Sequence, residues 1–277
     1  MRFAVSVQNF ADYADIRRLV ALAREAEDNG WDGFFLWDHI HWNGPPMIDP
    51  WVALAAIASV TSRIRIGTMV TPLARRRPWK LARETVTLDH LSGGRLILGV
   101  GLGTPPAEEF SRFGEDSDDQ IRGQKLDEGL EVITGLWSGE PFSYRGKHYQ
   151  LDNVTFLPRP VQQPRIPIWV AGLWPNRRPF RRAARLDGVV PLKVGPSADL
   201  PGALTPDELP APLTYIQEHR ESDAPFDVNA SSAIPTDLGR AKDVVDAFAA
   251  AGATWLQEWQ PTADALSARL RAGPPPR

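Results

Sequence analysis

The side chains best suited to chemistry lie in residues 37–42 (WDHIHW), directly after a short apolar run. Imidazole titrates near neutral pH, so His39 can donate a hydrogen bond or move a proton. The indole of Trp42 can form one wall of a pocket for a planar ligand by offset stacking. Asp38 and His41 have a structural interpretation at least as good, in which Asp38 caps the loop backbone and His41 is exposed. We therefore predict a site whose catalytic residues are His39 and Trp42.

The His39-x-His41 spacing also permits a metal site of the kind that some barrel hydrolases use. A catalytic zinc site takes about three protein ligands, usually histidines with carboxylates. The other histidines, His90, His148 and His219, do not follow predicted strands. The sequence therefore favours a site without metal. Cysteine is absent, which removes thiolate ligands, disulfides and a cysteine nucleophile.

Two further hydrolase classes have no support in the sequence. No Gly-x-Ser-x-Gly motif occurs, so there is no nucleophile elbow for a serine. A glycosidase needs two carboxylates across a cleft, and the acids expected at strand ends are Asp38 and Glu258. These two acids do not by themselves indicate such a cleft.

Two loops offer places for a cofactor. Residues 99–103 (GVGLG) lack the further glycine of a dinucleotide fingerprint, because Thr104 stands there, and lack the lysine of a Walker loop. We interpret their small residues as letting a flat ligand approach the backbone, or else as a tight turn. Residues 171–176 (AGLWPN) follow another apolar run and open a helix, so their N–H groups can receive a phosphate. The alternative is an ordinary helix cap beside two solvated arginines.

The elements that position these loops follow from hydrophobic patterning. Apolar runs at 64–70 and 96–100 flank an amphipathic helix pattern at 79–91. Continuous apolar runs indicate strands buried on both faces, and a helix between them makes them parallel. The loops at the carboxyl ends of parallel strands lie side by side, where α/β folds hold their ligands.

Repetition of this unit predicts the α/β class and a (β/α)8 TIM barrel with an insertion between strands four and five. The predicted strands are residues 3–8, 33–37, 64–70, 96–100, 166–171, 188–192, 226–234 and 253–258. We expect one barrel domain over 1–271, with the insertion at about 140–165 forming a hairpin around Gly146. Residues 195–212 are predicted as a loop and 272–277 as a disordered tail.

Composition restricts the class of protein. The chain has 277 residues, of which 43% are hydrophobic and 23% charged, with a net charge of −3. A single α/β barrel takes about 250 residues, so one domain suffices. We expect no nucleic-acid partner, because no basic surface is indicated. No apolar run approaches the roughly 18 residues of a membrane span, and the first residues do not form a signal peptide, so we expect a cytoplasmic protein.

Three stretches resemble the bacterial luciferase-like family of flavin-dependent oxidoreductases and monooxygenases. They are GWDGFFLWDH (30–39), RIRIGTMVTPLARRRPWKLARETVTLDHLSGGRLILGVGLG (63–103) and IPIWVAG (166–172), in the same order and spacing as in that family. The resemblance covers nearly the whole chain. It implies a (β/α)8 barrel with an insertion, a homodimer, and a cofactor that is either reduced FMN or the 8-hydroxy-5-deazaflavin coenzyme (F-420).

The resemblance also assigns residues. It implies that His39 faces the flavin ring, that Trp42 stands one residue before an active-site tryptophan of deazaflavin-dependent sugar-phosphate dehydrogenases, and that Met69-Val70 is a strand bulge often containing a cis peptide. Thr104 stands where those dehydrogenases have a glutamate, which argues against their proton transfer and their substrate. The candidate cofactor-binding residues are Asp38, Met69, Val70, Thr71, Gly101, Leu102, Gly103, Ala171, Gly172, Leu173, Trp174 and Asn176.

These observations together predict a flavin-dependent oxidoreductase. We expect a luciferase-like monooxygenase that uses reduced FMN and oxygen on a small organic substrate, with a separate reductase as partner. The alternative is hydride transfer with the deazaflavin coenzyme. A metal-dependent barrel hydrolase and a non-catalytic flavin-binding protein are more remote alternatives.

Overall fold

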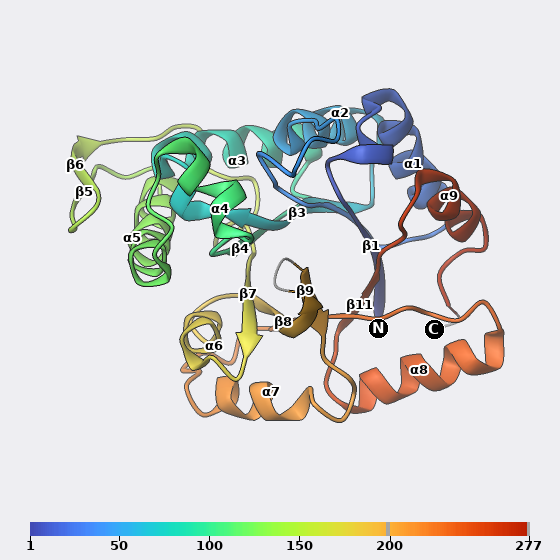
Figure 1. Cartoon of the computed structure of the whole chain (residues 1–277). Coiled ribbons are helices and arrows are strands. Elements are labelled where there is room, and N and C mark those ends of the chain that lie inside the picture. The colour runs from blue at the N-terminus through green and yellow to red at the C-terminus, as the bar shows by residue number, and fades with distance from the viewer. Residues whose placement is uncertain (198–199, 276–277) are drawn as a thin grey trace.

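The chain forms a closed barrel of parallel strands surrounded by helices, as the sequence predicts (Figure 1). The computed structural model describes residues 1–197 and 200–275. The barrel strands are β1 (Arg2–Val7), β2 (Gly33–Leu36), β3 (Arg65–Pro72), β4 (Leu96–Gly101), β7 (Ile168–Trp174), β8 (Gly188–Ser197), β10 (Asp227–Ser231) and β11 (Trp255–Glu258). They follow the order β10-β11-β1-β2-β3-β4-β7-β8, and pairing of β8 with β10 closes the ring.

The helices begin where capping residues allow. The longer ones are α1 (Ile16–Asp28), α2 (Pro50–Val60), α3 (Pro78–Ser92), α5 (Asp119–Trp137), α7 (Pro210–Gln217), α8 (Leu238–Ala250) and α9 (Ala263–Arg271), and the shorter ones are α4 (Pro106–Glu109) and α6 (Arg177–Ala183). The carboxylate of Asp49 accepts a hydrogen bond from the N–H of Val52, with Pro50 in the first turn of α2. This confirms the helix start expected from the sequence. Gly30 follows α1 with φ of 84°, a conformation that favours glycine.

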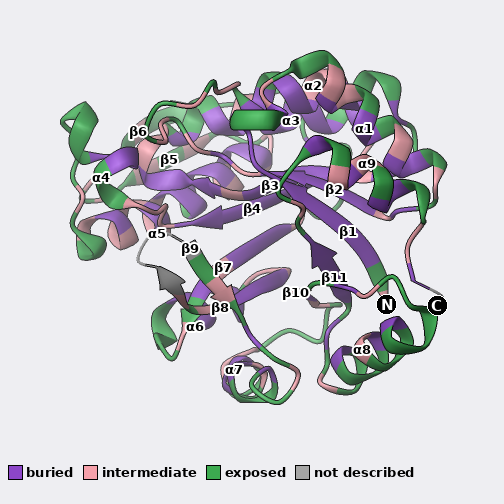
Figure 2. Ribbon diagram, turned by 45° about the vertical axis from the view of Figure 1, so that its right-hand side comes forward, coloured by how far each residue is buried: buried purple, intermediate pink, exposed green. Residues whose placement is uncertain are grey.

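The barrel interior is filled by its own apolar side chains. Ala4, Phe35, Met69, Ile97, Trp169, Val190 and Trp255 form this inner cluster, separate from the larger core between strands and helices. The rings of Trp169 and Trp255 are 5.3 Å apart, centroid to centroid, and both residues are fully buried. Figure 2 shows the barrel strands as mostly buried. Because the interior is packed, a ligand has access only to the ends of the barrel.

The insertion between β4 and β7 contains the expected hairpin. Strands β5 (Phe142–Arg145) and β6 (Gln150–Val154) pair antiparallel beside α5 (Figure 1). Glu128 of α5 holds the turn, since its carboxylate accepts hydrogen bonds from the N–H groups of residues 147–149.

One connecting segment differs from expectation, and the predicted tail is described only in part. The predicted loop at 195–212 was wrong in part, because β8 continues to Ser197 and pairs with an added antiparallel strand, β9 (Leu200–Ala203). In the predicted tail, Pro275 is buried, while residues 276 and 277 lie outside the described part. None of the described helices is both long enough and apolar enough to cross a membrane.

Candidate active site at the carboxyl end of the barrel

His39 is held at the carboxyl end of β2 by its backbone and by its ring. The buried amide of Asn9 donates to the carbonyl oxygen of His39 at 2.8 Å and accepts from the N–H of His39 at 3.2 Å. The ring Nδ1 lies 2.7 Å from Oε1 of Glu109. A carboxylate accepts but does not donate, so Nδ1 carries the proton and Nε2 of a neutral His39 is left as an acceptor.

Asp38 is the centre of a buried charge cluster. Its carboxylate accepts hydrogen bonds from Thr71 Oγ1 at 2.7 Å, Trp51 Nε1 at 3.1 Å, Arg76 Nη2 at 2.7 Å and Arg75 Nη2 at 2.9 Å. Burial alone would raise the pKa of Asp38, but the charges of Arg76 and Arg75, with hydrogen bonds from Arg76 and Thr71, hold this pKa below its usual value. Asp38 is therefore an ionised anchor that ties the start of α2 and the end of β3 to the His39 loop.

The structure brings two glutamates to the same place, which the sequence reasoning missed. Glu109, fully buried on α4, contacts His39, and the neighbouring Glu108 contacts Nδ1 of His41 and accepts from Arg112 Nε at 2.8 Å. Thr104 stands in place of the glutamate of the deazaflavin-dependent dehydrogenases, but Glu109 brings a carboxylate to His39 from farther along the same loop. The signal was present in residues 105–110 (PPAEEF), because a proline pair begins a short helix that carries the acids back to the barrel mouth.

Aromatic rings surround His39. Trp42 stacks on Phe10 at 5.3 Å with an interplanar angle of 12°, and its ring meets the edge of His39 at 4.9 Å. Trp37 also contacts His39, at 5.8 Å between ring centroids, and stacks at 6.2 Å and 20° on Trp259, which is 46% exposed. The predicted pair of His39 and Trp42 is thus in contact. Phe10 and Trp259 join them from the ends of β1 and β11, and spacing in the sequence gave no signal for either.

The β3 bulge explains the glycines of β4. The Met69-Val70 peptide is cis, as the resemblance implied, and the register of β3 against β4 shifts between Thr68 and Thr71. A Cβ at Gly99 would lie 2.1 Å from the carbonyl oxygen of Thr68, and one at Gly101 would lie 2.8 Å from Val70 Cγ2. Packing against the bulge therefore requires these glycines, so the close approach of a ligand is not needed to explain them.

Several candidate cofactor residues turn their side chains away from the mouth. The alternation of β7 puts Ala171 and Leu173 on its inner face and Gly172 and Trp174 on its outer face, where Trp174 packs edge-on against Phe180. Leu102 likewise packs in the outer core. Asn176 caps α6 by accepting from the N–H of Arg178 at 3.3 Å.

All of these candidates stay predictions as cofactor-binding residues, and the structure shows where the side chain of each one lies. Asp38 and Thr71 are buried in the charge cluster, Leu102 and Trp174 pack in the outer core, and a Cβ at Gly172 would meet Pro179. Met69 is buried inside the barrel below the mouth. Val70, Gly101, Gly103, Ala171 and Leu173 remain near the mouth or on its inner face.

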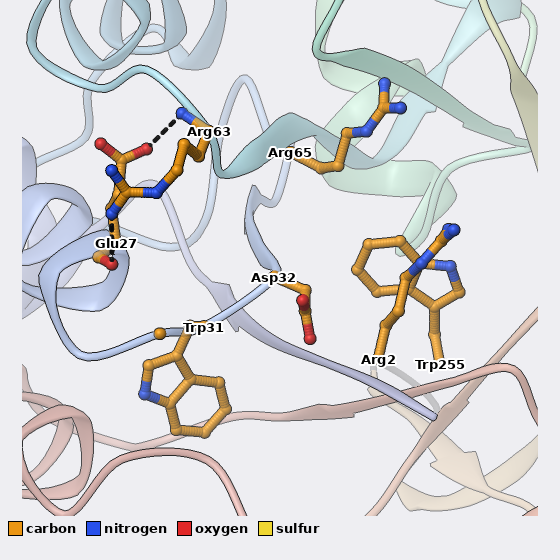
Figure 3. A pocket seen from close by; sticks show the side chains of 8 residues that line it. Arg2, Glu27, Trp31, Asp32, Arg63, Arg65 and Trp255 are labelled. Carbon is orange, nitrogen blue, oxygen red and sulfur yellow. Dashed lines mark hydrogen bonds between the residues drawn. The ribbon is translucent and has the colours of Figure 1, made fainter. Parts of the chain in front are cut away.

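Two hollows bear on the choice of site. One of about 320 Å³ lies beside His39 and is also lined by Met47, Ile48 and Arg75. A larger one of about 380 Å³ lies at the opposite, amino-terminal end of the barrel (Figure 3). There the carboxylate of Glu27 accepts hydrogen bonds from the N–H groups of residues 62–64. This charged group therefore has a structural role, which is to bind the backbone before β3. Because conserved chemistry in such barrels lies at the carboxyl end, we place the candidate site at His39.

The fold agrees with solved structures over nearly the whole chain. The coenzyme F420-dependent tetrahydromethanopterin reductase of Methanopyrus kandleri superposes with a TM-score of 0.79 at 18% identity, covering 98% of each chain. The monooxygenase RslO1 of Streptomyces bottropensis gives a TM-score of 0.75 at 21% identity, covering 98% of this chain and 97% of that one. At these identities the likeness concerns the fold.

Sequence comparison gives the family. The oxygenase component of a flavin-dependent trigonelline monooxygenase from Acinetobacter baylyi is 31% identical over 186 residues, 65% of this chain and 51% of that protein. An F420-dependent glucose-6-phosphate dehydrogenase from Microbacterium testaceum is 36% identical over 156 residues, 54% of this chain and 45% of that protein. The chain thus spans about half the length of these relatives. The family model described as luciferase-like monooxygenase matches residues 1–196, and the chain belongs to this family.

Proposed function

We propose that this protein is a flavin-dependent monooxygenase that acts on a small organic substrate at the carboxyl end of the barrel. The observation that carries the proposal is the contact of His39 Nδ1 with Glu109 Oε1 at 2.7 Å, surrounded by aromatic rings. Reduced FMN would supply electrons to oxygen when bound there. Membership of a family that includes a named flavin-dependent oxygenase component supports this choice.

The residues at the mouth fit a planar cofactor. Val70 is half-buried on the bulge, and Leu173 and Trp259 expose 40% and 46% of their surface. Apolar surface of this kind, gathered at one end of a barrel, is typical of a ligand site. The inner faces of β3, β4 and β7 would hold the ring, and the segment 171–176 at the start of α6 would meet the phosphate.

The side chains at the barrel mouth would accept a proton from the ligand and exclude water from it. Glu109 fixes the His39 ring, so that Nε2 can accept a proton or a hydrogen bond from a bound ligand. Trp42 and Phe10 pack around that ring and keep it from rotating. The apolar mouth would exclude water once a ligand covers it.

Hydride transfer with the deazaflavin coenzyme (F-420) is the second candidate. A specific observation favours it, because Glu109 supplies a carboxylate beside His39 although Thr104 replaces the glutamate of the deazaflavin-dependent dehydrogenases. A relative named as an F420-dependent dehydrogenase also supports it. The pair of His39 and Glu109 suits proton transfer to a substrate oxygen in either reaction.

Cofactor titration separates the two candidates. FMN, reduced FMN and the deazaflavin coenzyme are each added to the protein, and binding is followed by fluorescence. We expect micromolar binding of reduced FMN and much weaker binding of the deazaflavin. The reverse order selects hydride transfer, and binding of none of the three contradicts both candidates.

Two partners belong to the same proposal. A separate reductase would supply reduced FMN, as the name of the Acinetobacter relative suggests.

A second copy of the chain would cover α2, whose sequence is apolar on every side and which leaves Val52 68% and Val60 40% exposed. Light scattering should give twice the monomer mass, and a Val52→Glu variant should give the monomer. We place the protein in the cytoplasm.

A further inference from the structure

Arg75 connects the two loops that hold His39 and Glu109. It ends a short 3-10 turn, η2 (Leu73–Arg75), directly after β3. Its Nη2 donates to the carbonyl oxygen of Asp38 at 2.8 Å and to Oδ1 of Asp38 at 2.9 Å. Its Nε lies 3.2 Å from Oε2 of Glu109. The guanidinium thus spans the loop after β2 and the short helix after β4.

This contact is enclosed by protein. The side chain of Arg75 is 8% exposed, that of Asp38 1% and that of Glu109 0%. Arg75 Nε and Glu109 Oε2 are not aligned as a hydrogen bond, and neither has another hydrogen-bond partner among the described residues. The two atoms therefore face one another as opposite charges. A buried carboxylate without a nearby cation would be strongly unfavourable.

The other charged side chains around this contact have partners of their own. Arg76 donates to both oxygens of Asp38. Glu108 is held by His41 and Arg112. Among the arginines and lysines of the described residues, Arg75 is thus the one whose ion pair reaches Glu109. Glu109 in turn gives its other oxygen to His39.

We propose that Arg75 is a positioning residue that acts on His39 through Glu109. By holding Oε2, it aims Oε1 at His39 Nδ1, which keeps the proton on Nδ1 and leaves Nε2 as the acceptor at the barrel mouth. The catalytic meaning of this arrangement rests on the proposed function, which gives His39 its task. The contacts of Arg75, Glu109 and His39 themselves do not depend on a bound cofactor. The role of Arg75 differs from that of Arg76, which contacts Asp38 without reaching Glu109.

The test measures the tautomer of His39 directly. Long-range ¹H–¹⁵N NMR spectra of the full chain, without cofactor, distinguish the Nδ1–H from the Nε2–H form of each neutral histidine. A His39→Gln spectrum identifies the signals of His39 among the 5 histidines. In the unmodified protein we expect the Nδ1–H form to dominate. In Arg75→Gln the ratio of the two forms should fall about tenfold, because Glu109 is no longer held and its charge-assisted hydrogen bond with Nδ1 of His39 weakens.

Arg76→Gln is the matched control, because it also removes an arginine from Asp38 but leaves the contact with Glu109. It should retain the ratio of the unmodified protein. If Arg75→Gln does not fold, Arg75→Lys takes its place. The lysine ammonium can contact Asp38 or Glu109 but not both at once. The ratio of the two tautomers should therefore fall less than in Arg75→Gln.

An unchanged ratio in the folded Arg75 variant, or an equal fall in Arg76→Gln, would overturn the proposal. Because the spectra need no ligand, they decide the role of Arg75 whether or not a flavin binds. Failure of the cofactor titration would contradict the proposed function and leave this result standing.

Discussion

The Nδ1 atom of His39 lies 2.7 Å from Oε1 of Glu109, although the two residues are 70 positions apart in the chain. The loop after β2 carries the imidazole, and the short helix after β4 carries the acid. Parallel strands bring these loops to one end of the barrel. A pair of this kind sets which nitrogen of the ring can accept a proton from a ligand.

Glu109→Gln should therefore lower turnover by about 10²-fold or more, since an amide cannot enforce one tautomer as a carboxylate does. Cofactor affinity should change little, because the side chain is fully buried. Glu108→Gln is the matched control, as the adjacent glutamate contacts His41 instead. Steady-state rates with the identified cofactor check this. Equal losses in both variants would show that the acids only support the loop.

This pair also shows how far the sequence could lead. The regular alternation of apolar strand runs and amphipathic helix patterns predicts the barrel. The position of His39 at a strand end identifies it as a candidate active-site residue. Glu109 was missed because its role depends on where a short, proline-initiated helix turns the chain. The contacts of the Asp38 and Trp174 side chains could not be predicted for a related reason. The face that a loop side chain presents is decided by packing between distant elements, which periodicity does not encode.

Gly99→Ala should destabilise the protein by several kcal/mol, since the added Cβ would meet the carbonyl oxygen of Thr68 at 2.1 Å and the bulge would have to move. Overpacking of a rigid core typically costs about 1–3 kcal/mol, and the cost is larger here because a backbone carbonyl group moves away less easily than a side chain. Chemical denaturation measures the difference. Gly123→Ala in α5 is the control, because nothing lies within 4 Å of the new Cβ. That change should be neutral or should stabilise by about 0.5–1 kcal/mol. Equal stabilities would contradict the packing explanation.

Glu258 should make stability depend on pH. Burial raises the pKa of its carboxyl to about 7, against the opposing effects of Arg269 and the N–H of Ile234. Because the folded pKa lies above the unfolded value, the contribution to stability is full at pH below about 4.5 and is lost as the pH rises through 7. The loss amounts to about 3 kcal/mol. Denaturation curves of the unmodified protein and Glu258→Gln between pH 4.5 and 8 test this.

The Glu258→Gln variant removes the titration and also the ion pair with Arg269. Its stability relative to the unmodified protein should therefore rise with pH, whatever the constant offset from the lost pair. A difference that does not change across this range would show that the carboxyl stays ionised in the folded protein throughout.

Trp259→Ala should weaken ligand binding with little loss of stability. The indole stacks on Trp37 at the barrel mouth and keeps 46% of its surface exposed, so its removal opens no cavity in the core. Trp37 in turn contacts His39, and an exposed aromatic ring next to this pair gains stability when a planar ligand covers it. Stacking of this kind is worth about 0.5–1.5 kcal/mol beyond area burial. We expect roughly a tenfold increase in the Kd of the cofactor or substrate. Trp79→Ala is the matched control, because this indole is 36% exposed on α3 and contacts Tyr149 instead. Equal effects of the two substitutions on affinity would place the ligand away from Trp259.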